Sequence, residues 1–428
     1  MVNARFQRLR SLIPLVGLGS LAIACTPSPD TSRPPTVTIL GSITGDGQTT
    51  IEQVMQPFTD ATGIEVIYEG TANFATLLPV RATAGNPPDL ALFPQPGLMA
   101  DLARQGELVP LTELIERSQL ETAFAQTWLD LGTVDGELYG LWSRADVKSL
   151  VWYRPDVFEA EGYAVPTTWD EMMALSDRLI SEGKTPWCLG IESGAASGWV
   201  GTDWIEDIVL REGGTDIYDR WVARDIPFTH PVIKTSFERF GAIARSSDYA
   251  LGGAIGVIST PFGDSPQPLF SNPPGCYLHR QANFISTFFP EDVEVGTDVA
   301  IFPLPSIEPD SDAPLLIAGT VFAALSDSPE TRALVEYLTT VEPHQRWVES
   351  ENYISPHQSI TPDSYTNPLL SQQAELLANA TSIRFDASDL MPGAVGTGTF
   401  WSGVVDYVGG ADLDGVLQAI DTSWPENE

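Results

Sequence analysis

Residues capable of metal or covalent chemistry are few in this chain and lie far apart. The histidines are His230, His279, His344 and His357. The cysteines are Cys25, Cys188 and Cys276. Neither set has metal-ligand spacing such as CxxC or HExxH, and the chain has no GxSxG motif and no phosphate-binding loop. With 57 acidic residues, carboxylates close together in sequence arise by chance. The sequence therefore predicts no metal, no cofactor and no catalytic centre.

The first 25 residues have the layout of an export signal. Three arginines precede an almost uncharged apolar run at residues 12–24, which is too short to span a bilayer as a mature helix. The segment LAIAC at residues 21–25 resembles the bacterial lipoprotein box, in which the sulfur of the cysteine, here Cys25, is lipidated and becomes the new N-terminus. An ordinary cleaved signal peptide at residues 1–24 is the alternative, because Ala22-Ile23-Ala24 also fits the Ala-x-Ala cleavage pattern. In both cases the rest of the chain folds outside the cytoplasm.

A tether follows the signal. Residues 26–35 contain four prolines with Ser, Thr and Asp, which predicts an extended linker after Cys25. The remaining stretch of about 390 residues is long enough for two or more domains. No later stretch is long and apolar enough to span a membrane.

The charge balance argues against nucleic acid and other polyanionic ligands. The chain has 22 basic against 57 acidic residues, a net charge of −35. Such a surface repels nucleic acid and anionic lipid headgroups. It also suits a saline exterior, where counterions screen self-repulsion. The alternative is that exported proteins are often simply acidic.

Two cysteines remain if Cys25 carries lipid. Cys188 and Cys276 would then be a pair in an oxidising compartment, which predicts a disulfide. Closing a loop of that length would stabilise the fold by about 4–5 kcal/mol. Two separate buried thiols are the alternative.

Hydrophobic periodicity predicts an α/β fold. A β-rich run at residues 37–40 is followed by a turn, a helix that stops at residues 62–63, and an alternating strand at residues 64–68. This order is the start of a βαβ unit and implies a parallel sheet, with another strand at residues 89–93.

The composition changes near residue 145. Thr168 and Glu171 form a capping box at the start of a helix, and Ser328 caps another. Further strands are predicted at residues 187–191, 299–302 and 315–325. Further helices are predicted at residues 205–209, 231–244, 369–380, after 398, and at 412–420. Residues 260–275 should form a loop.

Six phrases, in order along nearly the whole mature chain, carry a family resemblance. Three are AGNPPDLALFPQPG at 84–97, LWSRADVKSLVWYRPDVFEAEGYAVPTTWDEM at 141–172 and GWVGTDWIED at 198–207. The others are QANFISTFFP at 281–290, AGTVFAAL at 318–325 and RFDASDLMP at 384–392. Together they resemble the extracellular solute-binding proteins of bacterial ABC sugar importers, the maltose-binding-like family. The last phrases resemble the subgroup for α-glucosides and small glucosyl compounds such as trehalose, sucrose or glucosylglycerol.

The resemblance implies a two-lobe periplasmic-binding-protein fold of the α/β class, with a hinge and a ligand cleft between the lobes. Lobe 1 would take residues 36–145 and 293–343, and lobe 2 residues 146–292 and 344–428. It also implies a small sugar ligand, no enzyme activity, and delivery to a separate ABC permease with its own ATPase. We expect a monomer in the periplasm or at the outer face of the cytoplasmic membrane, touching the membrane only through a lipid anchor.

A sugar presents hydroxyls at its ring edge and C–H groups on its face, so its site needs carboxylates, amides and arginines around flat aromatics. Open α/β sheets bind ligands at the carboxyl ends of their strands. The lobe 1 candidates are Asp46, Gly47, Asn73, Phe74, Phe93, Gln95, Gly319 and Thr320. The candidates at the hinge and in lobe 2 are Asp146, Trp199, Asp203, Phe284 and Arg384.

Trp199 and Asp203 form the clearest predicted pair, in which the indole stacks on a sugar ring and the acid accepts from its hydroxyls. Trp204, on another side of the same helix, is expected in the core. Asp46 and Gly47 could instead form a plain turn.

Two candidates could instead be structural. Asp146 could form an ion pair with Arg144 or Lys148, and Arg384 could be held by Asp386 or Asp389.

Two other functions stay open. One is a secreted glycosidase with paired carboxylates. The other is the same scaffold binding another solute, such as a polyamine, since polyamine sites also use Asp and Trp.

Overall fold

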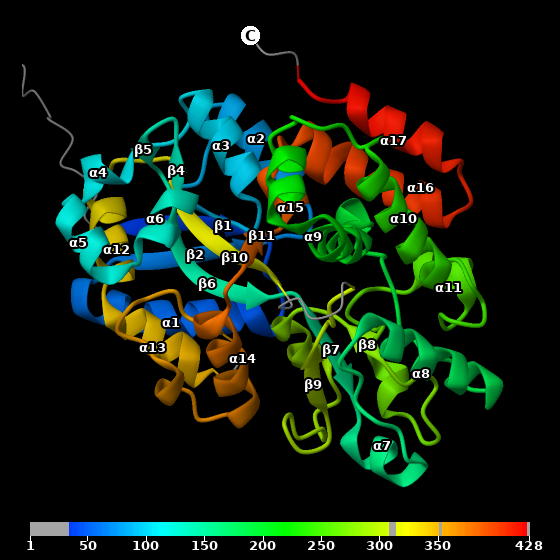
Figure 1. Ribbon diagram of the computed structural model, residues 1–428. Coiled ribbons are helices and arrows are strands. Elements are labelled where there is room, and N and C mark those ends of the chain that lie inside the picture. Colours follow the sequence, from blue (N-terminus) through cyan, green and yellow to red (C-terminus); the bar gives the residue numbers. More distant parts are fainter. Residues whose placement is uncertain (1–33, 308–313, 351–352, 426–428) are drawn as a thin grey trace, which may run out of the picture. The chain divides into compact units, whose positions relative to one another are not determined.

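The computed structural model describes residues 34–307, 314–350 and 353–425. Within these ranges the strands form a six-stranded sheet, a three-stranded sheet and a two-stranded hairpin (Figure 1). Cys25, the signal and most of the predicted linker lie outside the described residues.

The six-stranded sheet begins with the predicted parallel unit. Strand β1 (Thr36–Gly41) pairs in parallel with β2 (Glu65–Gly70) and with β3 (Leu90–Phe93), which confirms the βαβ prediction. Helix α1 (Asp46–Thr62) joins β1 to β2, and its apolar residues are buried as their spacing predicts. It ends at Gly63, whose φ of 74° is the left-handed conformation that glycine adopts at little cost.

Strand β10 (Leu315–Ala324) is the centre of this sheet. It runs antiparallel to β3 and to β6 (Leu141–Val147), and parallel to β11 (Ile383–Phe385). All ten of its residues are buried. A register shift between Thr320 and Val321 leaves Ser143 of β6 without an opposite residue, and its hydroxyl lies 2.8 Å from the Thr320 Oγ1.

The three-stranded sheet is antiparallel. Strand β7 (Leu150–Tyr153) lies between β8 (His279–Arg280) and β9 (Ala300–Pro303). The helices that follow β7 in the chain are α7 (Pro155–Glu161), α8 (Trp169–Ser181), α9 (Trp199–Val222), α10 (Pro231–Ala244) and α11 (Gly253–Ser259). The predicted capping box of Thr168 and Glu171 is present at the start of α8.

The remaining elements complete the layers around the sheets. Before β6 come α2 (Phe74–Thr83), α3 (Pro96–Arg104), α4 (Leu111–Leu114), α5 (Arg117–Ala123), α6 (Gln126–Leu131) and the hairpin of β4 (Thr133–Val134) and β5 (Glu137–Leu138). After β10 come α12 (Pro329–Leu338), α13 (Val341–Glu349), α14 (Pro368–Asn379), α15 (Ala387–Leu390), the π-helix η5 (Ala394–Phe400), α16 (Trp401–Val408) and α17 (Leu413–Thr422).

Most predicted helices are confirmed, including α10, α12 with its Ser328 cap, α14 and α17. The helix expected after Gly398 starts earlier, as η5. The loop predicted at residues 260–275 is confirmed apart from the short 3₁₀ segment Gln267–Phe270.

The strand predicted at residues 187–191 is wrong. Trp187 makes only isolated bridges, to Ala250 and Leu278. Gly190 lies so close to the Thr260 backbone that any side chain would collide with it. Both bridges are isolated, so the run forms no ladder.

Three connections join the six-stranded sheet to the three-stranded sheet or to α15, and we call them crossovers. The first crossover is Lys148-Ser149, between β6 and β7; of the second, between β9 and β10, the described parts are residues 304–307 and 314. The third leads from β11 into α15.

The predicted lobe boundaries remain a prediction, but two sets of contacts join residues that the prediction assigned to different lobes. Strand β9, assigned to lobe 1, pairs with β7. Trp347 and Tyr353, assigned to lobe 2, pack in one apolar cluster with Val37 and Ile39 of β1.

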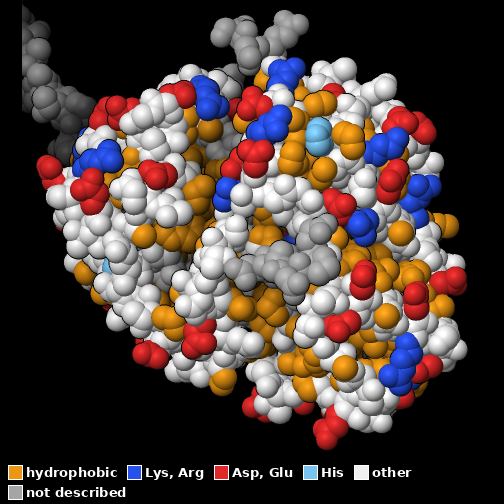
Figure 2. All heavy atoms as spheres, in the orientation of Figure 1, with side chains coloured by type: hydrophobic (Ala, Val, Ile, Leu, Met, Phe, Trp, Pro, Cys, Tyr) orange, Lys and Arg blue, Asp and Glu red, His pale blue; other side chains and the backbone are white. Residues whose placement is uncertain are grey.

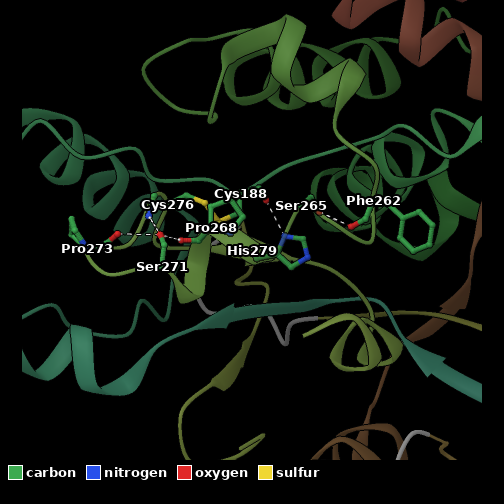
Figure 3. Close-up of a disulfide and its surroundings, with 9 residues drawn as sticks. Cys188, Phe262, Ser265, Pro268, Ser271, Pro273, Cys276 and His279 are labelled. Carbon is green, nitrogen blue, oxygen red and sulfur yellow. Dashed lines mark hydrogen bonds between the residues drawn. A yellow bond between two sulfur atoms is a disulfide. The ribbon is translucent and has the colours of Figure 1, made fainter. Parts of the chain in front are cut away.

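The predicted disulfide between Cys188 and Cys276 is confirmed (Figure 3). Both cysteines are buried, and the Cys188 carbonyl lies 2.9 Å from the Nδ1 of His279. Burial lowers the pKa of His279 to about 4. The disulfide therefore joins two inner segments that are 88 residues apart.

Charged side chains are spread over the face of the molecule in Figure 2 rather than gathered in one patch. Among the helices of the described ranges, none combines the length and the apolar character needed to cross a membrane.

Candidate functional site

Strand β6 presents an ion pair beside two aromatic rings. The Nε of Arg144 lies 3.0 Å from the Oδ2 of Asp146, which is the structural alternative predicted for that acid. The guanidinium lies 5.1 Å from the ring centroid of Tyr353 and 5.8 Å from that of Phe284. The other oxygen of Asp146, Oδ1, is buried and has no hydrogen-bond partner among the described residues. It is an acceptor that needs a donor.

The 3₁₀ helix η3 (Asn283–Phe288) carries a second incomplete group. Asn283 is buried, and its Oδ1 accepts from the backbone N–H of Val147 at 2.8 Å. Its Nδ2 has no partner within the described ranges. Asn283 thus places an unused donor next to the strand that bears Asp146.

Trp199 stands at the start of α9 among aromatic rings. Gly198 before it has φ 108°, and a side chain there would overlap the Trp401 carbonyl. The indole packs against Phe262, with centroids 5.2 Å apart, and against Phe284 at 6.0 Å. Trp199 and Phe284 are both partly exposed, and the Phe284 ring lies below the Arg144 guanidinium of β6.

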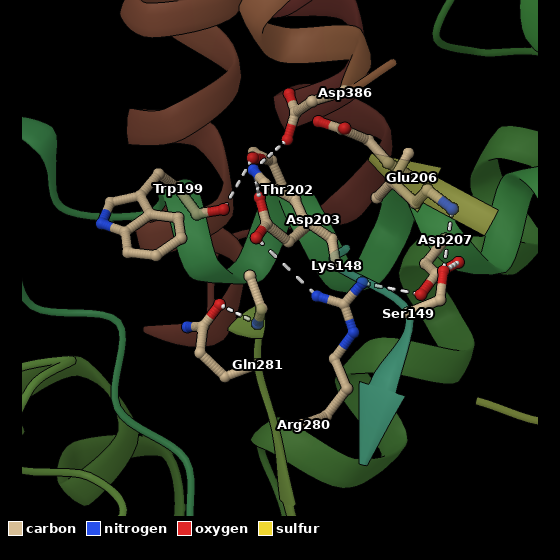
Figure 4. Close-up of polar contacts among 12 residues, drawn as sticks. Lys148, Ser149, Trp199, Thr202, Asp203, Glu206, Asp207, Arg280, Gln281 and Asp386 are labelled. Atoms are coloured by element: carbon tan, nitrogen blue, oxygen red, sulfur yellow. Dashed lines mark hydrogen bonds and ion pairs between the residues drawn. The ribbon is translucent and has the colours of Figure 1, made fainter. Parts of the chain in front are cut away.

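Lys148 joins this aromatic group to a buried carboxylate cluster (Figure 4). Its Nζ lies 5.5 Å from the Trp199 ring centroid and donates to Asp203 Oδ1 at 2.8 Å and to Asp386 Oδ2 at 2.5 Å. Asp389 is 3.9 Å away. Asp203 is fully buried and its Oδ1 accepts from Lys148, while its Oδ2 has no hydrogen-bond partner among the described residues.

The cluster continues along α9. Arg280 donates to Asp207 Oδ2 at 2.7 Å and lies 3.8 Å from Asp203 Oδ2, and Figure 4 shows its guanidinium between the two acids. Arg211 donates to the other oxygen of Asp207. Glu206 accepts from backbone N–H groups of α15.

This cluster has more acids than bases. Asp203, Glu206, Asp207, Asp386 and Asp389 face Lys148, Arg211 and Arg280, and all are buried.

Burial shifts the pKa of several of these acids. It raises the pKa of Asp203 to about 8 against the opposing attraction of Lys148. It also raises the pKa of Glu206 and Asp389 well above the usual range, with Asp386 adding repulsion. For Asp386 burial acts in the same direction, but Lys148 outweighs it and the pKa falls to about 2. Protons on some of the carboxyls therefore balance the charge.

Three lobe 1 candidates lie along β10 or next to it. Thr320 pairs with Arg144 and Gly319 with Ala145. A side chain at Gly319 would meet the Arg144 carbonyl and the Trp142 ring, so glycine permits this close pairing. Gln95, where β3 leads into α3, is buried with no partner for Oε1 in the described part of the chain.

Other lobe 1 candidates are placed differently. Phe74 and Phe93 pack edge to face in the core, with centroids 5.4 Å apart, and neither has a free face. Asp46 and Gly47 begin α1, and Asn73 precedes α2. Across the described ranges no hydrogen bond or ion pair links these three to Trp199 or Asp203.

Arg384 is held by an acid that the sequence did not indicate. Its Nε and Nη2 donate to the two carboxylate oxygens of Asp219, at 2.5 and 2.7 Å. Asp386, its predicted alternative partner, is taken by Lys148. Trp204 is fully buried, as predicted.

Sequence reasoning missed the charged centre of this region. Lys148 was predicted only as a partner of Asp146, and Asp386 and Asp389 only as partners of Arg384. A usable signal was the spacing of Asp203, Glu206, Asp207 and Arg211, which share one helical face inside an otherwise apolar stretch.

The sequence matches the profile of the family described as bacterial extracellular solute-binding protein over residues 41–345. It is 57% identical over 389 residues to the osmoprotective compounds-binding protein GgtB of Synechocystis sp., covering 91% of this chain and 92% of that relative. It is 43% identical over 397 residues to the alpha-glucosides-binding periplasmic protein AglE of Rhizobium meliloti, covering 91% and 87%.

Solved structures share the fold at low identity. The bacterial solute receptor AcbH matches with a TM-score of 0.78 at 16% identity, covering 91% of this chain and 98% of that chain. A chitin oligosaccharide binding protein matches with a TM-score of 0.77 at 19% identity and the same coverage. These matches confirm the predicted fold class.

Proposed function

Because the chain belongs to the family of bacterial extracellular solute-binding proteins, we propose that it binds a small α-glucoside or disaccharide-like solute and delivers it to an ABC importer. The names of two relatives support this class, since one binds osmoprotective compounds and the other alpha-glucosides. Trehalose, sucrose and glucosylglycerol are the proposed members.

The observation that carries the proposal is the meeting of apolar ring faces with unsatisfied polar atoms. Trp199 and Phe284 are partly exposed rings in contact with each other. Asp146 Oδ1 and Asn283 Nδ2 are a buried acceptor and a buried donor without partners among the described residues. A sugar has C–H faces for the rings and hydroxyls that both donate and accept.

The proposed roles differ between residues. Trp199 and Phe284 stack on the sugar, while Asp146 and Asn283 bind its hydroxyls. Asp203 does not contact the sugar; it accepts a hydrogen bond from Lys148 and so positions the Lys148 ammonium beside the Trp199 indole. Phe74, Phe93 and Arg384 are not part of the proposed site, because their contacts are already filled.

The family consists of binding proteins rather than enzymes, so the glycosidase alternative is not proposed. A polyamine remains the competing solute, because carboxylates and indoles also bind ammonium groups. Calorimetry of the purified protein against trehalose, sucrose, glucosylglycerol, maltose and spermidine separates the two. We expect binding of one or more of the sugars, and tight binding of spermidine alone would contradict the proposal.

Replacing the stacking ring tests the site. We expect Trp199→Ala to weaken sugar binding by about 1–2 kcal/mol, or roughly five- to thirtyfold, because a stacked ring face is lost. Trp424→Ala is the matched control, since Trp424 is a partly buried indole near the C-terminus that packs against Arg224. Calorimetry on both variants checks this, and equal affinities would remove Trp199 from the site.

We also propose that the protein is a monomer, anchored outside the cytoplasm through lipid on Cys25, and that it delivers solute to a separate permease and ATPase. Residues 26–35 would hold it near the permease at high effective concentration. Mass spectrometry of the mature N-terminus should find a lipid-modified Cys25. An unmodified N-terminus beyond Cys25 would contradict the anchor but not the binding function.

A further inference from the structure

Helix α9 has a row of charged side chains inside the protein. Asp203, Glu206, Asp207 and Arg211 follow the i, i+3, i+4, i+8 spacing of one helical face. All four are buried, and so are the apolar residues between them. The break in the helix, at Gly214, comes after this row, so the four lie on one continuous segment. Each makes contacts outside α9, and these contacts lead to the three crossovers.

The first crossover is bound by two of these acids. Lys148 donates to Asp203, and the Ser149 hydroxyl donates to Asp207 Oδ1 at 2.8 Å. The same hydroxyl accepts from the backbone N–H of Leu316 at 2.8 Å. Ser149 therefore links α9 to the first crossover and also to the beginning of β10.

The second crossover is bound by Arg211. Its guanidinium donates to the carbonyls of Leu304, at 2.8 Å, and Pro305, at 3.0 Å, which follow β9. It also donates to the carbonyl of Pro314, next to β10, at 2.9 Å. One planar group thus joins the chain where it leaves β9 to the chain where it enters β10.

The third crossover is bound by Glu206. Its two oxygens accept from the N–H groups of Ala387, at 2.8 Å, and Ser388, at 3.1 Å. Asp386, one residue earlier, is bound to Lys148 of the first crossover. The three crossovers therefore share one network of contacts, and α9 is its common element.

We propose that the buried polar face of α9 is a positioning element that holds the three crossovers in register with one another. Resting on the proposed function, it also fixes the solute site, because Trp199 begins α9 while Asp146 lies on β6, directly before the first crossover. Glu206 and Arg211 act through other residues and touch no solute.

The first test needs no ligand. Ser149→Ala removes the hydroxyl that joins Asp207 to Leu316. Hydrogen exchange of the full protein, followed by mass spectrometry, should then show at least about fivefold faster exchange in the peptide covering residues 385–389, which Ser149 does not contact. Ser176→Ala is the matched control, because Ser176 is equally buried and, among the described residues, its hydroxyl bonds only to the carbonyl of Met172 in its own helix. Faster exchange at residues 314–317 alone, or equal effects in the two variants, would overturn the proposal.

A second variant tests the network at a residue other than Ser149, so that the result does not depend on the immediate surroundings of Ser149 alone. Arg211→Lys keeps the charge but cannot span both sides of the second crossover. We expect faster exchange at residues 147–150 and 385–389, with Arg239→Lys as control, since Arg239 pairs with Glu212 and not with a crossover. Unchanged exchange at both peptides would contradict a shared network.

Affinity gives a separate readout. We expect Ser149→Ala to weaken sugar binding at least about fivefold, while Ser176→Ala stays within about twofold of the parent. If the parent protein binds no sugar, the proposed function fails, and the exchange data still decide the positioning role. If it binds sugar and Ser149→Ala binds it equally well, the link between the network and the site is wrong.

Discussion

At the scale of single residues, Asp203 shows how burial changes an ordinary side chain. The sequence suggested a rim carboxylate that accepts sugar hydroxyls. The structure places it inside, facing Lys148, Arg280, Asp386 and Glu206. Burial raises its pKa to about 8, although Lys148 opposes the shift. Its proton is therefore gained or lost near neutral pH.

This pKa predicts a pH dependence of stability. In the unfolded chain Asp203 has its usual pKa of about 4, so between pH 4 and 8 the native state holds more protons than the unfolded state. The contribution of Asp203 to the free energy of unfolding is thus present at low pH and is lost as the pH rises toward 8. From pH 6.5 to 8 we expect a loss of about 1–2 kcal/mol.

Comparison with Asp203→Asn measures that contribution together with the coupling of Asp203 to Glu206 and Asp389, because asparagine resembles the protonated acid and does not titrate. Urea unfolding without ligand should show the stability of the parent falling relative to the variant by that amount over this pH range. The buried histidines His279 and His344, whose lowered pKa values act in the opposite direction below about pH 6.5, are common to both proteins and cancel. Parallel pH curves would contradict the assignment.

At the scale of elements, the features that depend on residues close together in sequence could be predicted. The capping box of α8 and the Ser328 cap of α12 were readable because the partners lie three residues apart. The strand predicted at residues 187–191 is absent because the bridges from Trp187 to Ala250 and Leu278 are isolated and no ladder continues from them. β propensity describes the residue and not whether a neighbour is available.

The candidate site, too, has a part that the sequence could predict and a part that it could not. Trp199, Phe284 and Asp146 are candidates that the sequence offered, because flat aromatic rings and carboxylates match the C–H faces and the hydroxyls of a sugar. The contact between Lys148 and Asp386 in the buried charged cluster could not be predicted, because the two residues are 238 positions apart in sequence. Only the row of charged residues on α9 was visible in the sequence as a pattern. Its structural role depends on the backbone groups that these side chains contact, which the sequence does not show.

At the scale of the whole molecule, net charge is the dominant property. The value of −35 comes from 57 acidic against 22 basic residues. The charges in the α9 cluster are buried, so salt affects them little, whereas exposed acids repel one another through solvent. Folding brings those exposed acids closer together than they are in the unfolded chain. Self-repulsion therefore opposes the folded state most strongly at low ionic strength.

Salt should relieve this repulsion. The Debye length falls from about 30 Å at 0.01 M to about 10 Å at 0.1 M, so most of the screening between distant surface charges occurs in that interval. We expect the Tm to rise over this interval and to rise less steeply above it, and calorimetric melting curves in NaCl check this. KCl at equal ionic strength should give the same curve, because screening depends on ionic strength and not on the identity of the cation. A flat Tm, or a rise with only one of the two cations, would mean that surface repulsion does not limit the stability of this protein.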